Sequence, residues 1–521
     1  MRCGLRKFIV QLNDKYLNIL FSLSLPVLSM AFFLFVGADG YFLCADSPSY
    51  IEFHKYAEGV MPIYPLFLFG NRLLFGETLY LDAVNVEQAL FASVCVLIFV
   101  LLIRKKFELR YWESYCVFLL ALLPFTVDLP EAMATQRIAT EGIAYAAFYL
   151  FMALLLKAVW TKHIRWIGLL IGMTLLLAAT RSQMQMLFGV CGIIFLYVVM
   201  TGQQFKALRE TRKKKWVLRL LIGLVGCILI SLVGVWCTGR ISTSYQKMVK
   251  WNRDRLMAKV QGPQIENTVQ IEETTDNSPA KRPNVDVTNQ YITLIFSKGM
   301  YEADYEDYLL FEDTRLRDLF LVFYQVVDED QGRYVFAHPG LWMWQDVVNG
   351  VGKMGSLCHE PQIRFYQGIP EIYNSDEYSA IRNGDQLQIG LTLVKAHFGR
   401  VLYHTLLLLP QAFIFTVFFK IEEIYVLCHL ITLFLYVSAF GLMIWAYKDK
   451  KIDRAYGEFM ASVLGVNIFM VLVISLIFFG HQRYVVYNFG IFYIIYFLLL
   501  LQLWKVYGKN WLFSWYRKRK S

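Results

Sequence analysis

Residues 20–38 read LFSLSLPVLSMAFFLFVGA, a stretch without a single charged side chain. A helix of about 20 such residues crosses a hydrocarbon core about 30 Å thick. Comparable stretches recur along the chain, which has 521 residues, of which 57% are hydrophobic and 18% are charged. Soluble proteins carry about 25% charged residues. The sequence therefore predicts an all-α polytopic membrane protein.

About eleven transmembrane helices are predicted, in two groups separated by a long polar region. The predicted spans are 17–38, 79–103, 114–129, 138–160, 166–181, 184–200, 217–238, 401–419, 424–446, 457–479 and 484–505. Residues 1–238 form the N-terminal membrane core, with its first outer loop at 39–78. A soluble extracytoplasmic domain is expected at 239–400, and its polar stretch 261–290 predicts a mobile loop. Residues 401–521 supply the C-terminal membrane helices and a basic tail.

Basic residues collect in short loops between the predicted spans. The net charge is +10, with 51 Lys and Arg against 41 Asp and Glu. Cytoplasmic loops of membrane proteins are enriched in Lys and Arg, which accounts for the positive charge without nucleic acid as a partner. The basic segments are RKKFELR (104–110), KALRETRKKKW (206–216), KDKKIDR (448–454) and RKRK (517–520).

The alternation of loops breaks in the C-terminal third. The two spans 401–419 and 424–446 would leave the basic loop 448–454 outside. Either one of the two spans is interfacial or re-entrant, or the charge rule fails locally. We favour a cytoplasmic tail, which puts the loop 480–483 outside. The chain also lacks an Asn-x-Ser/Thr acceptor triplet, which favours a bacterial plasma membrane.

Ionisable residues gather at the predicted outer face of the membrane. Such groups are expensive in lipid and are functional candidates by default. Each also has a structural explanation. Ser47 and Pro48 suit the start of a helix, with Ser47 as its N-cap. Arg137 and Glu141 are four apart and would pair on one helix face. Arginines at span ends also act as interfacial anchors. The outer-face set is Asp39, Asp46, Asp128, Glu131, Arg137, Glu141, Arg181, His397, Arg400, His404, His481 and Arg483.

Four motifs, taken in order, resemble the GT-C superfamily of membrane glycosyltransferases. The first, ADSPSYIEFHKYAEGVMPIYPLFLFGNRLLFG (45–76), contains Asp-Ser-x-x-Tyr and then Pro-x-Tyr-Pro-Leu. The others are ATEGIAYAAFYLFMALLL (139–156), LLIGMTLLLAATRSQMQML (169–187) and GHQRYVVYNFGIFYIIY (480–496). The chain departs from the family at Ala45, where glycine is usual, and at Ser182, where proline is frequent. The likeness is to the polyprenyl-phosphate-dependent members, such as the protein mannosyltransferase and aminoarabinose transferase families.

The resemblance implies that a sugar moves from a polyprenyl-phosphate donor to a glycan, glycolipid or cell-wall polymer. Asp46 would be the general base that takes the proton of the acceptor hydroxyl, and Glu141 would orient the acceptor or a cation. Cations would hold the leaving phosphate. The implied phosphate-binding residues are Arg181, Arg483, His481 and Arg400. The implied residues of the substrate channel are Asp39, Tyr50, Tyr64, Arg137 and Tyr484.

The implied partners are the lipid-linked donor, the acceptor and the surrounding membrane lipids. No cofactor is expected to be required. The adjacent residues Cys358, His359 and Glu360 include metal-binding types, but neighbours in sequence rarely give tetrahedral geometry, so no metal site is predicted. Three other functions stay open at this point. One is a polysaccharide polymerase or ligase, the second is a flippase or transporter for lipid-linked oligosaccharides, and the third is a non-catalytic membrane scaffold.

Overall fold

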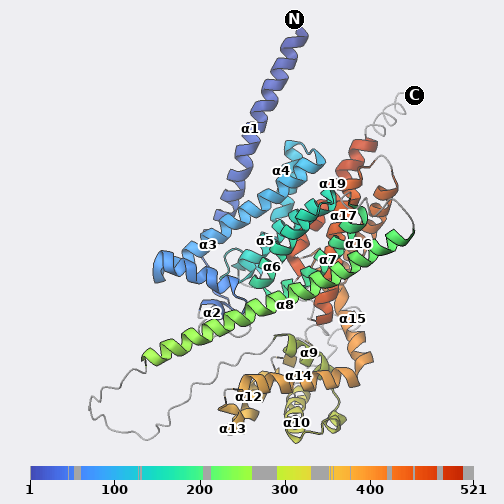
Figure 1. Cartoon of the computed structure of the whole chain (residues 1–521). Helices are drawn as coiled ribbons and strands as arrows, with labels where there is room; N and C mark the ends of the chain where they lie inside the picture. The colour runs from blue at the N-terminus through green and yellow to red at the C-terminus, as the bar shows by residue number, and fades with distance from the viewer. Residues whose placement is uncertain are drawn as a thin grey trace.

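The structure of the chain is a computed structural model (Figure 1). It describes residues 2–44, 46–51, 60–126, 128–129, 132–202, 213–260, 290–329, 351, 354–355, 357–375, 377–418, 425–449, 452–477 and 485–508. These residues are helical apart from turns and two short paired strands, β1 (Asp128–Leu129) and β2 (Ala132–Met133). Among them, eight helical segments are long and apolar enough to cross a membrane. The prediction of an α-helical membrane protein is therefore confirmed.

The N-terminal half contains most of the long helices. They are α1 (Arg2–Val36), α2 (Ser47–Ile51), α3 (Ile63–Phe107), α4 (Tyr111–Leu122) with η1 (Leu123–Phe125), α5 (Glu141–Thr161), α6 (Ile164–Thr180), η2 (Ser182–Met186), α7 (Leu187–Thr201) and α8 (Lys213–Val260). The sequence pattern places the second span at 79–103, whereas α3 begins 16 residues earlier. Its backbone kinks at Gly76, which has a φ of 73°, a conformation that glycine adopts without strain. Gly76 therefore divides α3 into two helical parts, and the apolar part before it meets the predicted span at the kink.

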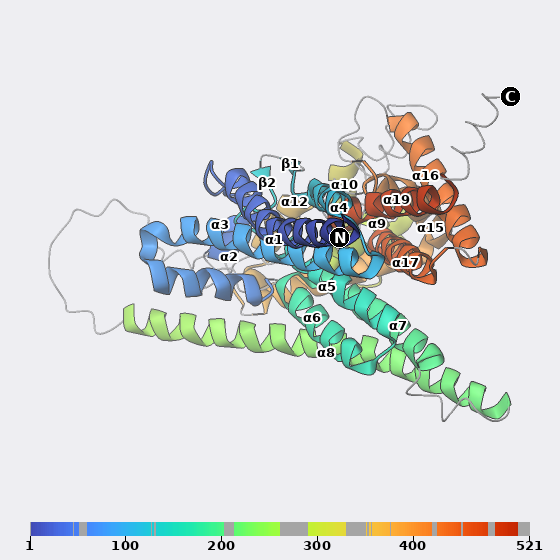
Figure 2. The same ribbon diagram turned by 90° about the horizontal axis from the view of Figure 1, so that it is seen from above.

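Polar bonds between apolar helices hold this half together. The hydroxyl of Ser93 in α3 donates to the hydroxyl of Ser29 in α1 over 2.8 Å. The hydroxyl of Tyr149 in α5 donates to the carbonyl of Ala121 in α4 over 2.6 Å. Small polar side chains of this kind let membrane helices approach closely and bond to one another. Seen from above, α8 lies along one side of the bundle beside α6 and α7 (Figure 2).

A second, separate hydrophobic core forms among the helices that follow residue 289. These helices are α9 (Gln290–Glu302), η4 (Tyr305–Leu310), α10 (Thr314–Glu329), α12 (His359–Gln367), α13 (Pro370–Tyr373) and α14 (Tyr378–Ala396). Their shared core includes Phe296, Phe320 and Tyr366. In Figure 1 this group lies beyond the end of the membrane bundle at which α2 is found. The predicted mobile loop 261–290 lies outside the described residues, except for its last residue, Gln290, where α9 begins.

The C-terminal helices are α15 (Phe398–Ile414), α16 (Tyr425–Lys448), α17 (Arg454–Ile477), η6 (Val486–Asn488), α19 (Phe489–Leu503) and the π-helical turn η7 (Trp504–Gly508). The predicted span 401–419 falls on α15, which has 17 residues, contains Pro410 and is not one of the eight long apolar segments. Two further predicted spans, 114–129 and 166–181, fall on shorter apolar helices.

A buried lysine ties the second core to the membrane helices. The ammonium of Lys298 in α9 donates to the carbonyls of Ser475 and Leu476, each over 2.7 Å. These carbonyls belong to the last turn of α17, where helix carbonyls have no partner within the helix. The end of α17 therefore lies at the same end of the bundle as α9.

Charged side chains collect at the opposite end of α17. Glu458, near its start, is buried and lies 3.3 Å from the ammonium of Lys162, at the end of α5. It also accepts a hydrogen bond of 2.9 Å from the hydroxyl of Tyr197, near the end of α7. The ends of α5 and α7 therefore lie beside the start of α17, at the end of the bundle opposite Lys298.

The close approach of α19 to α4 depends on Gly490. A Cβ atom at this position would lie 2.2 Å from the carbonyl oxygen of Leu120 and 3.0 Å from the hydroxyl of Tyr149. Because the nearest atom is backbone, Gly490→Ala should destabilise the purified protein by about 1–3 kcal/mol, measured as a lower unfolding temperature in detergent. Gly465→Ala is the matched control, since a Cβ atom there meets open space. Equal unfolding temperatures of Gly490→Ala and Gly465→Ala would contradict the close approach of α19 to α4.

Candidate functional site

The loop that follows α1 is fastened to the segment before α5. The N–H of Phe42 donates to the carbonyl of Gln136 over 2.8 Å, and the N–H of Ile138 donates to the carbonyl of Phe42 over 2.9 Å. These bonds form an isolated parallel bridge between Phe42 and Arg137. Backbone hydrogen bonds therefore hold together residues that are about 90 positions apart in sequence.

Ser47 adds a side-chain bond between the same two segments. Its hydroxyl accepts the N–H of Cys44 and donates to the carbonyl of Ile138, both over 2.8 Å. Sequence reasoning assigned this hydroxyl to the N-cap of the following helix. In the structure Ser47 is instead the first residue of α2. Its side chain bonds to the loop that follows α1 and to the segment before α5. The position of Asp46, one residue earlier, is fixed by these bonds.

The centre of the candidate site is a buried ion pair between α5 and α6. Nη1 of Arg181 lies 2.7 Å from Oε1 of Glu141, and the two side chains are only 7% and 1% exposed. Glu141 is the first residue of α5, where the positive end of the helix dipole favours a carboxylate. Arg181 directly follows the last residue of α6, where the dipole favours a cation. Sequence position at the two helix ends thus accounts for the placement of both charges.

Tyr50 connects this ion pair to Asp46. Burial raises the pKa of the Tyr50 hydroxyl, and the negative charges of Glu141 and Asp46 raise it further. Arg181 and a hydrogen bond with Thr140 act in the opposite direction and are outweighed. These interactions require the charged groups to lie close to the Tyr50 hydroxyl. Tyr50 therefore stays protonated at physiological pH, and its hydroxyl can donate a hydrogen bond as well as accept one.

The aromatic wall of the site is formed by two predicted channel residues. The rings of Tyr50 and Tyr64 meet edge to face with their centres 5.2 Å apart. The Tyr64 hydroxyl donates to Oε1 of Gln88 over 3.0 Å, and the amide of Gln88 donates to the carbonyls of Thr135 and Arg137. Gln88 thus fixes Tyr64 and the segment before α5 at the same time.

The structure brings together Asp46, Tyr50, Tyr64, Glu141 and Arg181, all from the predicted site. The backbone of Arg137 borders the same site, but the residue precedes α5, so the expectation that it shares a helix face with Glu141 is wrong.

The remaining predicted residues fall elsewhere or outside the described chain. Asp39 is exposed in the turn after α1. Arg400 lies in α15, well apart from α2 (Figure 1), where it pairs with Asp304. His481, Arg483 and Tyr484 lie outside the described residues.

Two residues of the neighbouring layer were missed from the sequence. The amide of Gln183 in η2 donates to the hydroxyl of Tyr487 in η6 over 3.3 Å. The ring of Tyr487 also packs on Tyr145 of α5, with centres 4.5 Å apart. The start of the last membrane helix is therefore held against the turn that carries Arg181. Gln88 and Gln183 could have been noticed as amides within or beside apolar spans, whereas nothing in the sequence marks Tyr487.

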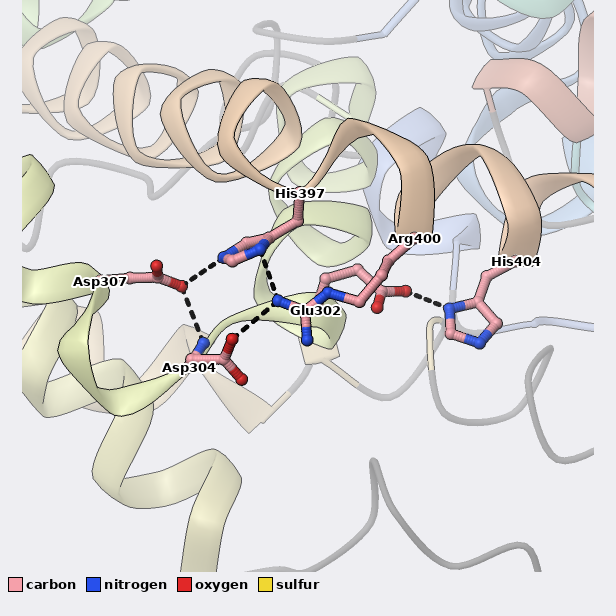
Figure 3. A network of polar contacts seen from close by, with 6 residues as sticks. All are labelled: Glu302, Asp304, Asp307, His397, Arg400 and His404. Carbon is pink, nitrogen blue, oxygen red and sulfur yellow. Dashed lines mark hydrogen bonds and ion pairs between the residues drawn. The ribbon is translucent and has the colours of Figure 1, made fainter.

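Metal ligands converge at one place in the described part of the chain, away from this site. Ligand atoms of Asp304, Asp307 and His397 lie within 4.8 Å of one another. The guanidinium of Arg400 bonds to Asp304 and to His397 (Figure 3), so a positively charged side chain already contacts this group. Cys358 is buried in the second core rather than exposed to a ligand.

Comparison of the chain with protein families, with characterised proteins and with solved structures finds no match.

The buried pair can be tested by a double-mutant cycle. Arg181→Met removes the guanidinium from the buried carboxylate of Glu141, and Glu141→Gln removes the carboxylate charge from the buried guanidinium of Arg181. Breaking one side of a buried pair costs about 3–5 kcal/mol, so each single variant should melt well below the wild type. The double variant should recover much of the loss, because neither charge remains. Losses that simply add would show that the two side chains do not interact.

Proposed function

We propose that the chain is an integral membrane glycosyltransferase of the GT-C type. It transfers a sugar from a polyprenyl-phosphate donor to a glycan, glycolipid or cell-wall polymer at the outer face of a bacterial plasma membrane. The observation that carries the proposal is the convergence of half-buried Asp46 and Tyr50 on the buried pair of Glu141 and Arg181. Three separate segments contribute these residues, and each segment contains one of the motifs on which the resemblance rests.

The proposed reaction assigns one task to each residue. The carboxylate of Asp46 takes the proton of the acceptor hydroxyl as its oxygen attacks the anomeric carbon of the sugar. The bond between that carbon and the phosphate oxygen breaks, and the polyprenyl phosphate leaves with the electron pair. Arg181 stabilises the negative charge of the leaving phosphate through charge-assisted hydrogen bonds. Glu141 holds the guanidinium in place, and Arg483 is the proposed second cation.

The proposed topology has ten crossings rather than eleven, with residues 239–400 outside as a soluble domain. Lys298 binds the end of α17, so α17 would end outside and begin inside. Lys448 at the end of α16 would then lie inside, and α16 would begin outside. It follows that α15 enters and leaves on the outer side.

This topology places all four basic segments inside, which an uninterrupted series of eleven crossings does not. In intact cells, a cysteine at exposed Glu312 should react with a membrane-impermeant maleimide, in a background lacking other accessible cysteines. A cysteine at exposed Lys448 should react only after the membrane is permeabilised. Labelling of the Lys448→Cys variant in intact cells would restore α15 as a crossing and refute the ten-span arrangement.

The activity is tested by supplying a panel of radiolabelled polyprenyl-phosphate sugars to membranes that contain the protein. With the active donor, Asp46→Asn should reduce turnover by roughly 10²–10⁴-fold, the usual contribution of a general base. Asparagine caps helices about as well as aspartate, so expression and melting should stay near wild type. Asp39→Asn is the matched control, because Asp39 is exposed and outside the site. A fully active Asp46→Asn variant would show that Asp46 is not the general base. If no polyprenyl-phosphate sugar in the panel is transferred, the proposed function is wrong.

A further inference from the structure

The helix α8 is much longer than a membrane crossing requires. It contains 48 residues, about 72 Å at 1.5 Å per residue, whereas the hydrocarbon core is about 30 Å thick. The apolar span predicted at 217–238 occupies its first part. Residues 239–260, called here the outer segment of α8, continue beyond that span as the same helix and project past α2 in Figure 1.

The outer segment of α8 is strongly basic. It contains six Lys and Arg against a single acidic residue, Asp254. Under the proposed topology it lies outside, directly after a span, although basic residues near span ends normally favour the cytoplasmic side. The neighbouring outer helices at 290–329 have the opposite character, with three basic and nine acidic residues. Positive charge is thus concentrated on α8 and needs its own explanation. The six cations are Arg240, Lys247, Lys250, Arg253, Arg255 and Lys259.

The start of the outer segment has a buried side and a polar exposed side. Thr238, Tyr245 and Val249 are buried, and their spacing places them on one side of the helix, against protein. A helix that binds a lipid surface turns its apolar side to the lipid, but here that side is already covered. The exposed side therefore favours an anionic polymer in water over a membrane surface. The exposed residues of 239–249 are Gly239, Arg240, Thr243, Ser244, Lys247 and Met248.

The two cations on this exposed side are not neutralised by a carboxylate of the described chain. The guanidinium of Arg240 lies 5.7 Å from the ring centre of Trp236, one turn earlier. Lys247 forms no ion pair with another described residue. By contrast, the arginine Arg364 in α12, 73% exposed, is paired with Glu360. The positive charge of the outer segment is therefore available to an external anion.

The helix α8 passes the candidate site before it leaves the bundle. It packs on η2, the turn that directly follows Arg181. It also lies close to the start of α7, since a Cβ atom on Gly234 would lie 2.4 Å from the ring of Phe188. The first cation of the outer segment, Arg240, comes less than two turns after Gly234. The basic segment thus begins near the turn that follows Arg181, where the acceptor of the proposed transfer must arrive.

We propose that the outer segment of α8 is the docking surface for a polyanionic acceptor, a glycan or cell-wall polymer that carries phosphate or carboxylate groups. The inference rests on the proposed function, because it names the acceptor class of that transfer. The cations are spread over about 29 Å of helix at 1.5 Å per residue, so successive anionic groups of one polymer chain bind at once. Several individually weak contacts then combine into a useful affinity.

Binding is measured on the full chain in detergent, with fluorescent long-chain polyphosphate as the probe and neutral dextran as the uncharged reference. Wild type should bind polyphosphate with an affinity that falls steeply with salt, because binding releases counterions. The triple variant Arg240→Gln/Lys247→Gln/Arg255→Gln should bind roughly tenfold more weakly, since each exposed contact is weak and three are removed.

The matched control removes three exposed positive charges elsewhere, so that net charge is the same in both variants. Lys105→Gln/Arg165→Gln/Lys448→Gln serves this purpose and should bind polyphosphate nearly as wild type does. Equal affinities of the two triple variants, or equal binding of dextran and polyphosphate by wild type, would overturn the proposal.

A chemical footprint locates the bound polymer and separates it from lipid. The acetylation rate of Lys247, followed by mass spectrometry in lipid discs, should fall severalfold when polyphosphate is added, while that of exposed Lys448 should not change. Replacing zwitterionic by anionic lipid, without polyphosphate, should leave Lys247 as reactive as before. Protection of Lys247 by anionic lipid alone would assign the surface to the membrane and refute the polymer.

Kinetics separate this inference from the proposed function. With the active donor, the triple variant of the outer segment should show a raised KM for the acceptor and a kcat near wild type, because the chemistry at Asp46 is untouched. An unchanged KM would overturn the docking surface and leave the transferase standing. Failure of the proposed function would instead appear as no transfer by the wild-type protein.

Discussion

The ion pair between Glu141 and Arg181 is the interaction on which the arrangement of the candidate site depends. Two nearly inaccessible charges are held 2.7 Å apart between the start of α5 and the end of α6. Such a pair is stable only when its geometry is good and its remaining valences are satisfied. Tyr50 interacts electrostatically with Glu141, Arg181 and Asp46. Any movement of α5 against α6 would separate the two charges, so the pair fixes the position of these two helices relative to each other.

Helix ends explain why polar groups meet where they do in so apolar a chain. Each helix leaves four N–H groups at its start and four carbonyls at its end without partners. Glu141 lies at the start of α5, and Lys298 donates to the carbonyls at the end of α17. In lipid, unsatisfied backbone groups are more expensive than in water. The need to satisfy these backbone groups therefore concentrates charged side chains at the helix ends, where they can take part in chemistry.

Sequence reasoning found what composition and short-range pattern encode. Apolar runs gave the membrane class and the centres of most long helices, and the position of charges at span ends gave Asp46, Glu141 and Arg181. It left the apolar segment before Gly76 in the loop 39–78, whereas the structure makes this segment the first helical part of α3. It misjudged Arg137, whose backbone bridges to Phe42 through a pairing set by tertiary contact. Tyr487 was invisible for a similar reason, since its partner Gln183 is 304 residues away.

Charge balance sets a condition on the proposed chemistry. At neutral pH, Asp46 and Glu141 carry two negative charges, and Arg137 and Arg181 at the same end carry two positive ones. A phosphate entering this neutral set would leave a net negative charge in a poorly solvated place, and uncompensated buried charge is strongly unfavourable. One more cation is therefore required when the donor is bound. Within the motif at 480–496, His481 and Arg483 come directly before the segment whose Tyr487 contacts Gln183. The need for a further positive charge is thus an independent reason to assign Arg483 to the phosphate.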